Sequence, residues 1–423
     1  MLALPWFAKR DGSQASSQTR HGARRLDKSH NINALLVDPS RFTAPYDAQL
    51  SSGLVQAGVN PIWAVRPLRA GETEELPFGT ERMIFYRRSD RPGNVPGFAR
   101  KPLKALAHFA GLWRLLTLAR KTRADVIHFQ WAVLPLFDAL AMWLLRKRYP
   151  LVLTVHDSVP FNGLRMSFFQ RFAFDLPMKI ANRIIVHTPV AKRALTARGI
   201  PEDKIAIIPH GPLRLLARAQ PPPVKSDGVW TFVMFGLLKS YKGIDTLIEA
   251  VGGIHAQVKG RARFLIAGAA HMDVEPLRAS IQKLGVEDIV ELRVGYLTND
   301  ELAALFAEAD CFLFPYRQID ASGAYYLAKP LGKWIIASEV GIFSEDVIPG
   351  KTGLLVPPGQ SKALAQAILE SLDRRPAPTT GTLESSWDHI GQLTRTQYQA
   401  LLNHEANPAV RQRSARSVER KPI

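Results

Sequence analysis

Short apolar runs alternate with longer helical patterns along most of this chain. The apolar runs of the first half cover residues 32–37, 61–65, 83–86, 126–129, 151–155, 184–186 and 205–208. Helical periodicity is clearest over residues 100–123 and 136–146, which lie between such runs. Uninterrupted apolar runs are typical of strands buried on both faces, so the pattern predicts a parallel sheet covered by helices.

The same alternation restarts after a proline-rich, polar stretch at residues 216–229, which we interpret as a linker. Further runs cover residues 231–235, 264–267, 289–294, 311–314, 334–337 and 353–356, and helical patterns follow at 364–372 and 387–402. We therefore predict an α/β protein with two doubly wound, Rossmann-like domains, residues 31–215 and 230–382. Such folds bind ligands at the carboxyl ends of their strands, so we expect a central cleft there.

The composition is that of an ordinary globular protein, with 46% hydrophobic and 22% charged residues. The single cysteine, Cys311, lies in an apolar run and is expected to be a buried small hydrophobe. One cysteine excludes a disulfide framework and fits a reducing compartment. Neither a secretory signal pattern nor a run of ~18–20 uncharged apolar residues is present, so we expect a cytoplasmic protein.

A formal net charge of +18 predicts attraction to polyanions. Part of the charge lies in two polar tails, residues 1–30 and 405–423, which we expect to be disordered. The denser part lies in the helical pattern of 100–123, where seven cations and no acid are interleaved with leucines, Phe109 and Trp113. This helix is interpreted either as peripheral on an anionic membrane or as packed with a solvated basic edge. Nucleic acid is not an expected partner, because no base-reading module is present.

Two turns carry residues suited to phosphate binding. Gly236, Lys239 and Lys242 follow the run 231–235, and Ser322 and Gly323 follow the run 311–314. Glycine, hydroxyl and lysine groups where a strand passes to a helix can hold a phosphate. Two such turns in one half indicate a pyrophosphate and therefore a nucleotide-sugar enzyme. The alternatives are solvated lysines at a helix start and a plain serine N-cap.

Several short motifs occur in a characteristic order. They are Val155-His156-Asp157, Pro209-His210-Gly211, Gly236…Lys239…Lys242-Gly243, Phe314-Pro315-Tyr316, Asp320-Ala321-Ser322-Gly323, Gly332-Lys333 and Gly353-Leu354-Leu355-Val356. In this order they resemble the GT-B glycosyltransferases of family 4, which are retaining and use nucleotide sugars.

This resemblance implies an acceptor-binding first domain and a nucleotide-sugar-binding second domain, with residues 383–404 forming a helix that returns to the first. It implies transfer of a hexose from a UDP- or GDP-hexose donor to a glycan acceptor, expected to be lipid-linked, at the inner membrane during bacterial surface or exopolysaccharide synthesis. No cofactor and no metal are expected. Neither an Asp-x-Asp motif in a cleft-like position nor a His/Cys metal spacing occurs, and lysines would take the role of the metal.

The resemblance also assigns roles to individual residues. His156, after the run 151–155, and Asp320 are the predicted catalytic residues, in contact with the transferred sugar or the acceptor. The predicted donor-binding residues are Gly236, Lys239, Lys242, Ser322, Gly323, His210 and Glu345. From the residues alone, His156 and His210 also read as structural histidines, and Asp320 as the start of the turn before Ser322.

Four positions depart from the family pattern. Phe42-Thr43-Ala44-Pro45-Tyr46-Asp47 stands where a pair of glycines is usual, and Leu237 stands where an arginine is usual. Of two usual glutamates, the first is Asp320 and the second, which contacts the ribose, is Ala328. Two alternatives to a transferase therefore stay open: a GT-B-like sugar-nucleotide epimerase or hydrolase, and a catalytically silent scaffold of the same fold.

Overall fold

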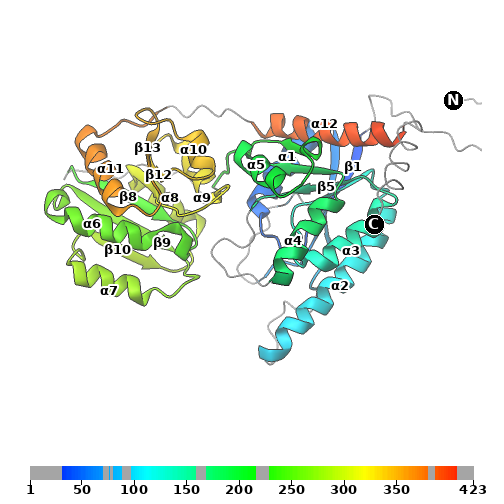
Figure 1. The fold of residues 1–423 in the computed structure, drawn as a ribbon, viewed down its shortest axis with the longest axis horizontal. Coiled ribbons are helices and arrows are strands. Elements are labelled where there is room, and N and C mark those ends of the chain that lie inside the picture. The colour runs from blue at the N-terminus through cyan, green and yellow to red at the C-terminus, as the bar shows by residue number, and fades with distance from the viewer. Residues whose placement is uncertain are drawn as a thin grey trace, which may run out of the picture. The chain divides into compact units, whose positions relative to one another are not determined.

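The computed structural model describes residues 31–69, 76, 80–87, 97–158, 168–215, 228–379 and 386–406. The first half is built on a seven-stranded parallel sheet in the order β3-β2-β1-β4-β5-β6-β7. Its strands are β1 (Ile32–Asp38), β2 (Val59–Val65), β3 (Glu81–Met83), β4 (Val126–Phe129), β5 (Leu151–Thr154), β6 (Arg183–Val186) and β7 (Ile205–Ile207). The predicted parallel, doubly wound arrangement is confirmed for this half (Figure 1).

Helices cover both faces of this sheet. They are α1 (Ala44–Gln56), α2 (Gly97–Lys121), α3 (Pro135–Arg146), α4 (Phe168–Ile180), α5 (Pro189–Ala197) and the 3-10 helix η1 (Glu202–Lys204). One sheet face, including Leu35 and Phe129, packs with the buried sides of α2, α3 and α5. The opposite face, including Leu36 and Val152, packs with α1. Side chains that alternate between two buried faces explain why these strands read as uninterrupted apolar runs.

The strand expected at residues 83–86 is displaced in the structure. β3 ends at Met83, and Tyr86 adopts a left-handed conformation with φ of 45°. Phe85 and Tyr86 are instead buried beneath α2, where Phe85 lies so close to Gly111 that an added Cβ would meet it at 2.2 Å. Their apolar character therefore reflects helix packing rather than strand pairing.

The second half contains a six-stranded parallel sheet in the order β10-β9-β8-β11-β12-β13. Its strands are β8 (Trp230–Phe235), β9 (Ala262–Gly268), β10 (Val290–Val294), β11 (Cys311–Phe314), β12 (Trp334–Ser338) and β13 (Gly353–Val356). Its helices are η2 (Ser240–Lys242), α6 (Ile244–Val258), α7 (Glu275–Leu284), α8 (Asn299–Glu308), α9 (Gly323–Ala328), η3 (Lys329–Leu331), α10 (Ile342–Asp346) and α11 (Ser361–Arg374). Cys311 is fully buried in β11, as expected.

The last helix, α12 (Trp387–Ala406), contacts the first half of the chain. Tyr398 hydrogen-bonds His128 of β4 at 2.6 Å, and the indole of Trp387 donates to the carbonyl of Pro212 at 2.8 Å. Glycines permit the approach of α12 to α1, since a Cβ on Gly53 would meet the carbonyl oxygen of Trp387 at 2.0 Å. A helix from the end of the chain thus completes the core of the first sheet.

Some of the expected segments lie outside the described residues. These are the two basic tails, most of the linker and residues 383–385. The domain boundaries therefore stay predictions. Within the part of the chain that is described, no helix combines the length and apolar character required to cross a bilayer.

Candidate functional site

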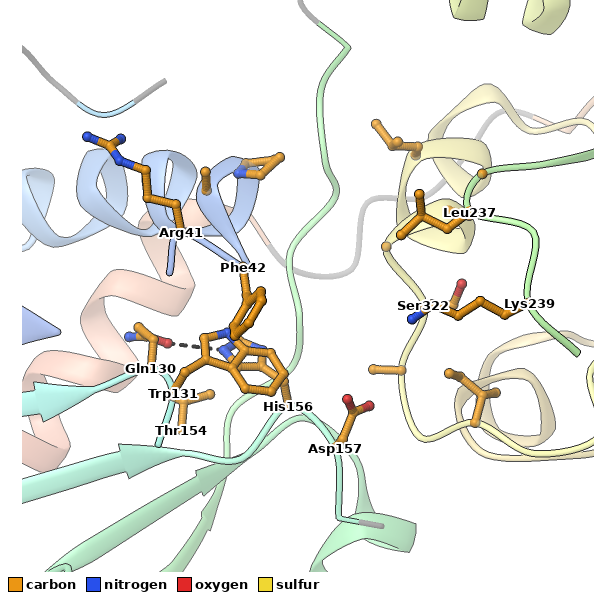
Figure 2. Close-up of a pocket in the computed structure, with 18 of the residues that line it drawn as sticks. Arg41, Phe42, Gln130, Trp131, Thr154, His156, Asp157, Leu237, Lys239 and Ser322 are labelled. Carbon is orange, nitrogen blue, oxygen red and sulfur yellow. Dashed lines mark hydrogen bonds between the residues drawn. The ribbon is translucent and has the colours of Figure 1, made fainter. Parts of the chain in front are cut away.

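A cavity of about 1050 Å³ lies where strands of both sheets end. Residues that follow β1, β4 and β5 line it from the first half, and residues that follow β8 and β9 line it from the second. Carboxyl ends of parallel strands are where doubly wound folds bind ligands. The predicted residues Gly236, Lys239, Lys242, Ser322 and Gly323 all line this cavity, as does His156. Figure 2 shows Lys239, Ser322 and His156 among the lining side chains.

The turn after β8 brings two lysines to the cavity. Gly236 has a φ of 96°, and a Cβ there would come within 3.1 Å of the Lys242 ammonium. Glycine therefore leaves room for Lys242 to lie against the turn. Lys239 is half-buried beside it, with its ammonium 5.9 Å from the ring centre of Tyr241.

Lys242 is a buried cation. The residue is only 6% exposed, and its ammonium donates a hydrogen bond to the carbonyl of Phe235 at 3.3 Å. The ring of Tyr316 lies 5.2 Å away, whereas no carboxylate of the described residues forms an ion pair with Lys242. Burial lowers the pKa of Lys242 to about 8, so the group still carries its charge at neutral pH. A buried ammonium without a carboxylate partner favours binding of an anion.

A second glycine fixes the path of the same turn. Gly243 adopts a φ of 71°, and a Cβ there would meet the carbonyl oxygen of Pro315 at 2.0 Å. The turn after β8 can therefore pack against the turn after β11 only with glycine at this position. Arg317 braces the contact, because its guanidinium donates to the carbonyl of Ser240 at 2.8 Å and pairs with Asp245 at 2.6 Å.

The segment after β11 places Ser322 and Gly323 in the cavity wall. The hydroxyl of Ser322 accepts a hydrogen bond from the amide of Tyr325 at 3.3 Å, so Ser322 is the N-cap of α9. The capping interpretation offered by the sequence is thus correct, and it coexists with the position of Ser322 in the cavity.

His156 is held by protein groups on both ring nitrogens. Its Nε2 lies 3.2 Å from the side-chain oxygen Oε1 of Gln130, and its Nδ1 lies 3.2 Å from Nε2 of His187. The ring stacks on Trp131 with centroids 5.1 Å apart (Figure 2). Tyr46 contacts it from another side, at 5.0 Å. The orientation of the imidazole is therefore fixed before any ligand binds.

This network presents an acceptor to each ring nitrogen of His156. His187 donates its Nδ1–H to the carbonyl of Ile208 at 3.0 Å, and burial lowers the pKa of His187 to about 4. Nε2 of this neutral ring can only accept, and Oε1 of Gln130 can only accept as well, so a neutral His156 donates to one of these two acceptors at a time. Burial, followed by the neighbouring His187, holds the pKa of His156 well below its usual value. His156 is therefore a neutral hydrogen-bonding group at pH 7 and not a cationic acid.

Three of the predicted site residues do not line the cavity. The carboxylate of Asp320 accepts a hydrogen bond from the backbone amide of Ser158, and Glu345 accepts one from the amide of Val190 at 3.0 Å. His210 stacks on Tyr326 with centroids 3.8 Å apart and an interplanar angle of 1°. In this structure each of the three side chains contacts a segment that is distant in the sequence.

The loop that replaces the usual glycine pair has its own support. The buried carboxylate of Asp38 accepts from the amides of Ser40 and Thr43, each at 3.2 Å. Burial, and then the nearby Asp38, raises the pKa of Asp47 well above its usual value. The loop so held projects Phe42 into the cavity, 61% exposed and edge-on to Trp131 at 5.5 Å.

Sequence reasoning missed several lining residues. Gln130 and Trp131 follow the run 126–129 in the same way that His156 follows the run 151–155. The strand-end rule that identified His156 would therefore have found them as well. Tyr241, also in the wall, lies between the two lysines and carries no signal of its own.

No metal site is evident within the described ranges. Nowhere among these residues do three or more His, Cys, Asp or Glu side chains converge as metal ligands. The cavity instead offers ammonium, hydroxyl, backbone amide and imidazole groups next to aromatic and aliphatic surface. This arrangement suits a ligand that has an anionic part and a sugar-like or apolar part.

Two family models match the chain. The model Glycosyltransferase Family 4 matches residues 47–211, and the model Glycosyl transferases group 1 matches residues 230–374. The D-rhamnosyltransferase WbpZ of Pseudomonas aeruginosa is 26% identical over 258 residues, which are 58% of this chain and 63% of that protein. A phosphatidyl-myo-inositol mannosyltransferase of Mycobacterium leprae is 30% identical over 254 residues, which are 59% of this chain and 64% of that protein. The chain thus spans less than two thirds of the length of these curated relatives.

Solved structures share the fold. The Anabaena protein HepE in complex with UDP-glucose matches with a TM-score of 0.62 at 19% identity, over 89% of this chain and 98% of that one. Identity this low supports the fold alone. Together with the two parallel sheets and the two family models, it shows that this chain belongs to the family 4-like glycosyltransferases of the GT-B fold.

Proposed function

We propose that this protein transfers a hexose from a nucleotide-diphosphate sugar, UDP- or GDP-linked, to a glycan acceptor. The observation that carries the proposal is the buried ammonium of Lys242 at the cavity, without a carboxylate partner in the described chain. An anionic diphosphate is the ligand that would stabilise such a group. Lys239, beside it, would provide a second positive charge.

The chemistry follows from charge that develops on the leaving diphosphate. Cations that are already in place stabilise this charge without reorganisation, and loss of one such contact lowers the rate by roughly 10²–10³. Lys242 is held by its backbone contacts before the donor arrives. Both lysines together would perform the role that a divalent ion has in other transferases, so the proposed reaction is independent of metal. Retention of anomeric configuration is proposed on the family resemblance.

We assign the neutral His156 to the transferred sugar or the acceptor. Its ring lies in the cavity wall with Phe42 and Trp131, and aromatic faces of this kind stack on sugar rings. Asp320 acts in this proposal through the loop at Ser158, which it holds beside the cavity.

The proposed acceptor is lipid-linked, and the proposed setting is the synthesis of a bacterial surface or exopolysaccharide. One relative is named as a mannosyltransferase that acts on phosphatidyl-myo-inositol, and another as a D-rhamnosyltransferase. The first name supports a lipid-linked acceptor, and the second supports transfer of a hexose. The protein would then be a cytoplasmic protein bound peripherally to the inner membrane, and nucleic acid would not be a partner.

A catalytically silent scaffold is the second candidate, and two positions favour it. Leu237, where the family has arginine, lines the cavity with an apolar side chain. Ala328, where the family has the glutamate that contacts the ribose, is fully buried in α9. A sugar-nucleotide epimerase or hydrolase remains the alternative within the enzymes.

A donor panel separates these candidates. The purified protein is mixed with UDP- and GDP-hexoses, and both the thermal midpoint and the products are measured with and without a lipid-linked acceptor extract. We expect one donor to raise the midpoint and its sugar to appear on the acceptor. Binding without turnover would support a scaffold, and acceptor-independent consumption would support a hydrolase or epimerase. If no sugar nucleotide raised the midpoint, donor binding itself would be refuted.

A further inference from the structure

Helices α2 and α3 carry an unusual amount of exposed apolar surface. Nine of the nineteen exposed large hydrophobic residues in the described chain lie on these two helices. They are Leu103, Leu106, Phe109 and Trp113 on α2, and Leu136, Phe137, Leu140, Trp143 and Leu144 on α3. A concentration of this kind marks an interaction surface, whereas single exposed hydrophobic residues do not.

The nine side chains form one surface, which we call the apolar ridge. On each helix they recur at helical spacing and therefore lie along one stripe. The two stripes meet, because the rings of Phe109 and Phe137 lie 6.3 Å apart at 75°. Trp113 is 65% exposed on α2, and Trp143 is 50% exposed on α3.

The ridge is not a core face that has rotated outward. The opposite sides of both helices are already buried, for example at Leu115 of α2 and Met142 of α3. A buried polar network fixes the rotation of the helices. The carboxylate of Asp138 lies 2.8 Å from Nε2 of His108, and Nδ1 of His108 lies 2.8 Å from the hydroxyl of Tyr86.

Positive charge surrounds the ridge. The exposed residues Lys104, Arg114, Arg120 and Lys121 lie on α2, and Arg146, Lys147 and Arg148 lie at the end of α3. Asp138 is the one acidic residue in the two helices, and it is buried in the network with His108. The ammonium of Lys147 lies 3.9 Å from the ring of Trp143, a cation–π contact that keeps the indole and the positive charge side by side on the surface.

We propose that the apolar ridge inserts into the boundary between the headgroups and acyl chains of an anionic bilayer. Tryptophan, phenylalanine and leucine on one face, with lysine and arginine at its edge, are the composition of helices that lie in this boundary. The absence of exposed acidic residues on both described helices matches the negative sign of the lipid surface. Binding then combines insertion with electrostatic attraction, and salt removes only the second.

The ridge begins next to the cavity along the chain. Val133 and Pro135, at the beginning of α3, line the cavity, and Leu136 is the first residue of the ridge on that helix. This step rests on the lipid-linked acceptor proposed above. An amphiphilic acceptor could keep its lipid chain in the bilayer beside the ridge while its sugar enters the neighbouring cavity. The partner of the ridge is thus the lipid surface that holds the acceptor.

The test is flotation of the full chain with phosphatidylglycerol-containing vesicles and with neutral phosphatidylcholine vesicles. The double variant Trp113→Gln/Trp143→Gln removes the two exposed tryptophans, and Val55→Gln/Ile348→Gln is the matched control at exposed apolar sites elsewhere. Circular dichroism confirms that each variant is folded. We expect the wild type and the control to float with anionic vesicles and to remain partly bound at high salt. The ridge variant should partition at least roughly tenfold less, since each tryptophan loses a large apolar area.

The proposal would be overturned if the wild-type protein did not bind anionic vesicles. It would also be overturned if the ridge variant bound them as well as the control does. If light scattering instead shows a wild-type dimer that the ridge variant converts to a monomer, without vesicle binding, the ridge is a contact between copies and the proposal fails. Turnover of a short-chain, water-soluble acceptor should be equal in the ridge variant and the control. Vesicle binding without any transfer would contradict the proposed function while leaving the ridge proposal intact.

Discussion

Replacing Lys242 with methionine should stabilise the protein and strongly lower its transfer rate at the same time. The ordinary lysine pKa of 10.5 falls to about 8 in the folded protein because the ammonium is desolvated. One pKa unit corresponds to about 1.4 kcal/mol. The buried ammonium therefore lowers the free energy of unfolding of the ligand-free protein by about 3 kcal/mol. An apolar side chain of similar length carries no such desolvation cost. For a body of this size, that gain raises the thermal midpoint by roughly 4 °C.

The sign of the pH dependence follows from the same pKa. Between pH 8 and 10.5 the unfolded chain holds a proton on Lys242 that the folded chain has released. The stability of the wild type therefore rises with pH across this window, and the full cost of the charge is present below pH 8. Lys242→Met should lose this slope. A bound diphosphate favours the charged lysine, so donor affinity should fall as the pH rises above 8 in the wild type and stay constant in the variant.

The assay combines thermal melts of the ligand-free protein from pH 7 to 10.5 with transfer rates at pH 7. Lys351→Met, which removes an exposed lysine, is the matched control and should leave both quantities unchanged. We expect Lys242→Met to melt higher than the wild type and to lose roughly 10²–10³ in transfer rate. A lower thermal midpoint of Lys242→Met would refute the desolvation cost of the ammonium. A transfer rate of Lys242→Met equal to that of the wild type would refute the role of Lys242 in stabilising the diphosphate.

Three further outcomes are expected. Transfer should persist in EDTA because the two lysines of the cavity carry the phosphate charge; loss in chelator with rescue by Mg²⁺ or Mn²⁺ would contradict this. Gly243→Ala should weaken donor binding in a calorimetric titration. The φ of 71° is unfavourable for alanine, and the new Cβ would lie 2.0 Å from the carbonyl oxygen of Pro315, so the turn must shift. Unchanged affinity would refute this steric argument. Asp138→Ala should lower the free energy of unfolding by about 3–5 kcal/mol, because it leaves the buried His108 and the partly buried amide of Leu134 without this carboxylate. In denaturant titrations, Glu202→Ala at an exposed ion pair should change that free energy by less than about 1 kcal/mol, and equal effects of the two would contradict a buried network.

The sheets could be predicted from the sequence because each strand is short, apolar and buried on both faces. β4, β11 and β13 have the predicted bounds, and most other strands differ by one or two residues at their ends. The turn from Gly236 to Gly243 was also predictable, since glycine is required where φ is positive and another backbone lies close. Local chemistry was sufficient in both cases.

Properties that depend on distant partners could not be predicted. The sequence shows Lys242 in a turn, but its burial depends on residues around Phe235 and Tyr316. The two acceptors that face His156 belong to Gln130, 26 residues earlier, and His187, 31 residues later. α3 was more misleading still, because its one acidic residue points inward and its largest apolar residues point to solvent. A helical pattern alone does not indicate which face is buried.

The hydrogen bond between His128 and Tyr398 joins residues 270 positions apart, and it has a consequence for the order in which the protein is made. The seven strands of the first sheet leave the ribosome before any strand of the second. Yet the groove beside Gly53, which receives Gly391 of α12, stays open until the end of the body has been synthesised. Domains commonly fold as they emerge during translation. Here the half that is synthesised first is completed last, and its unfinished surface is exposed throughout the synthesis of the other half.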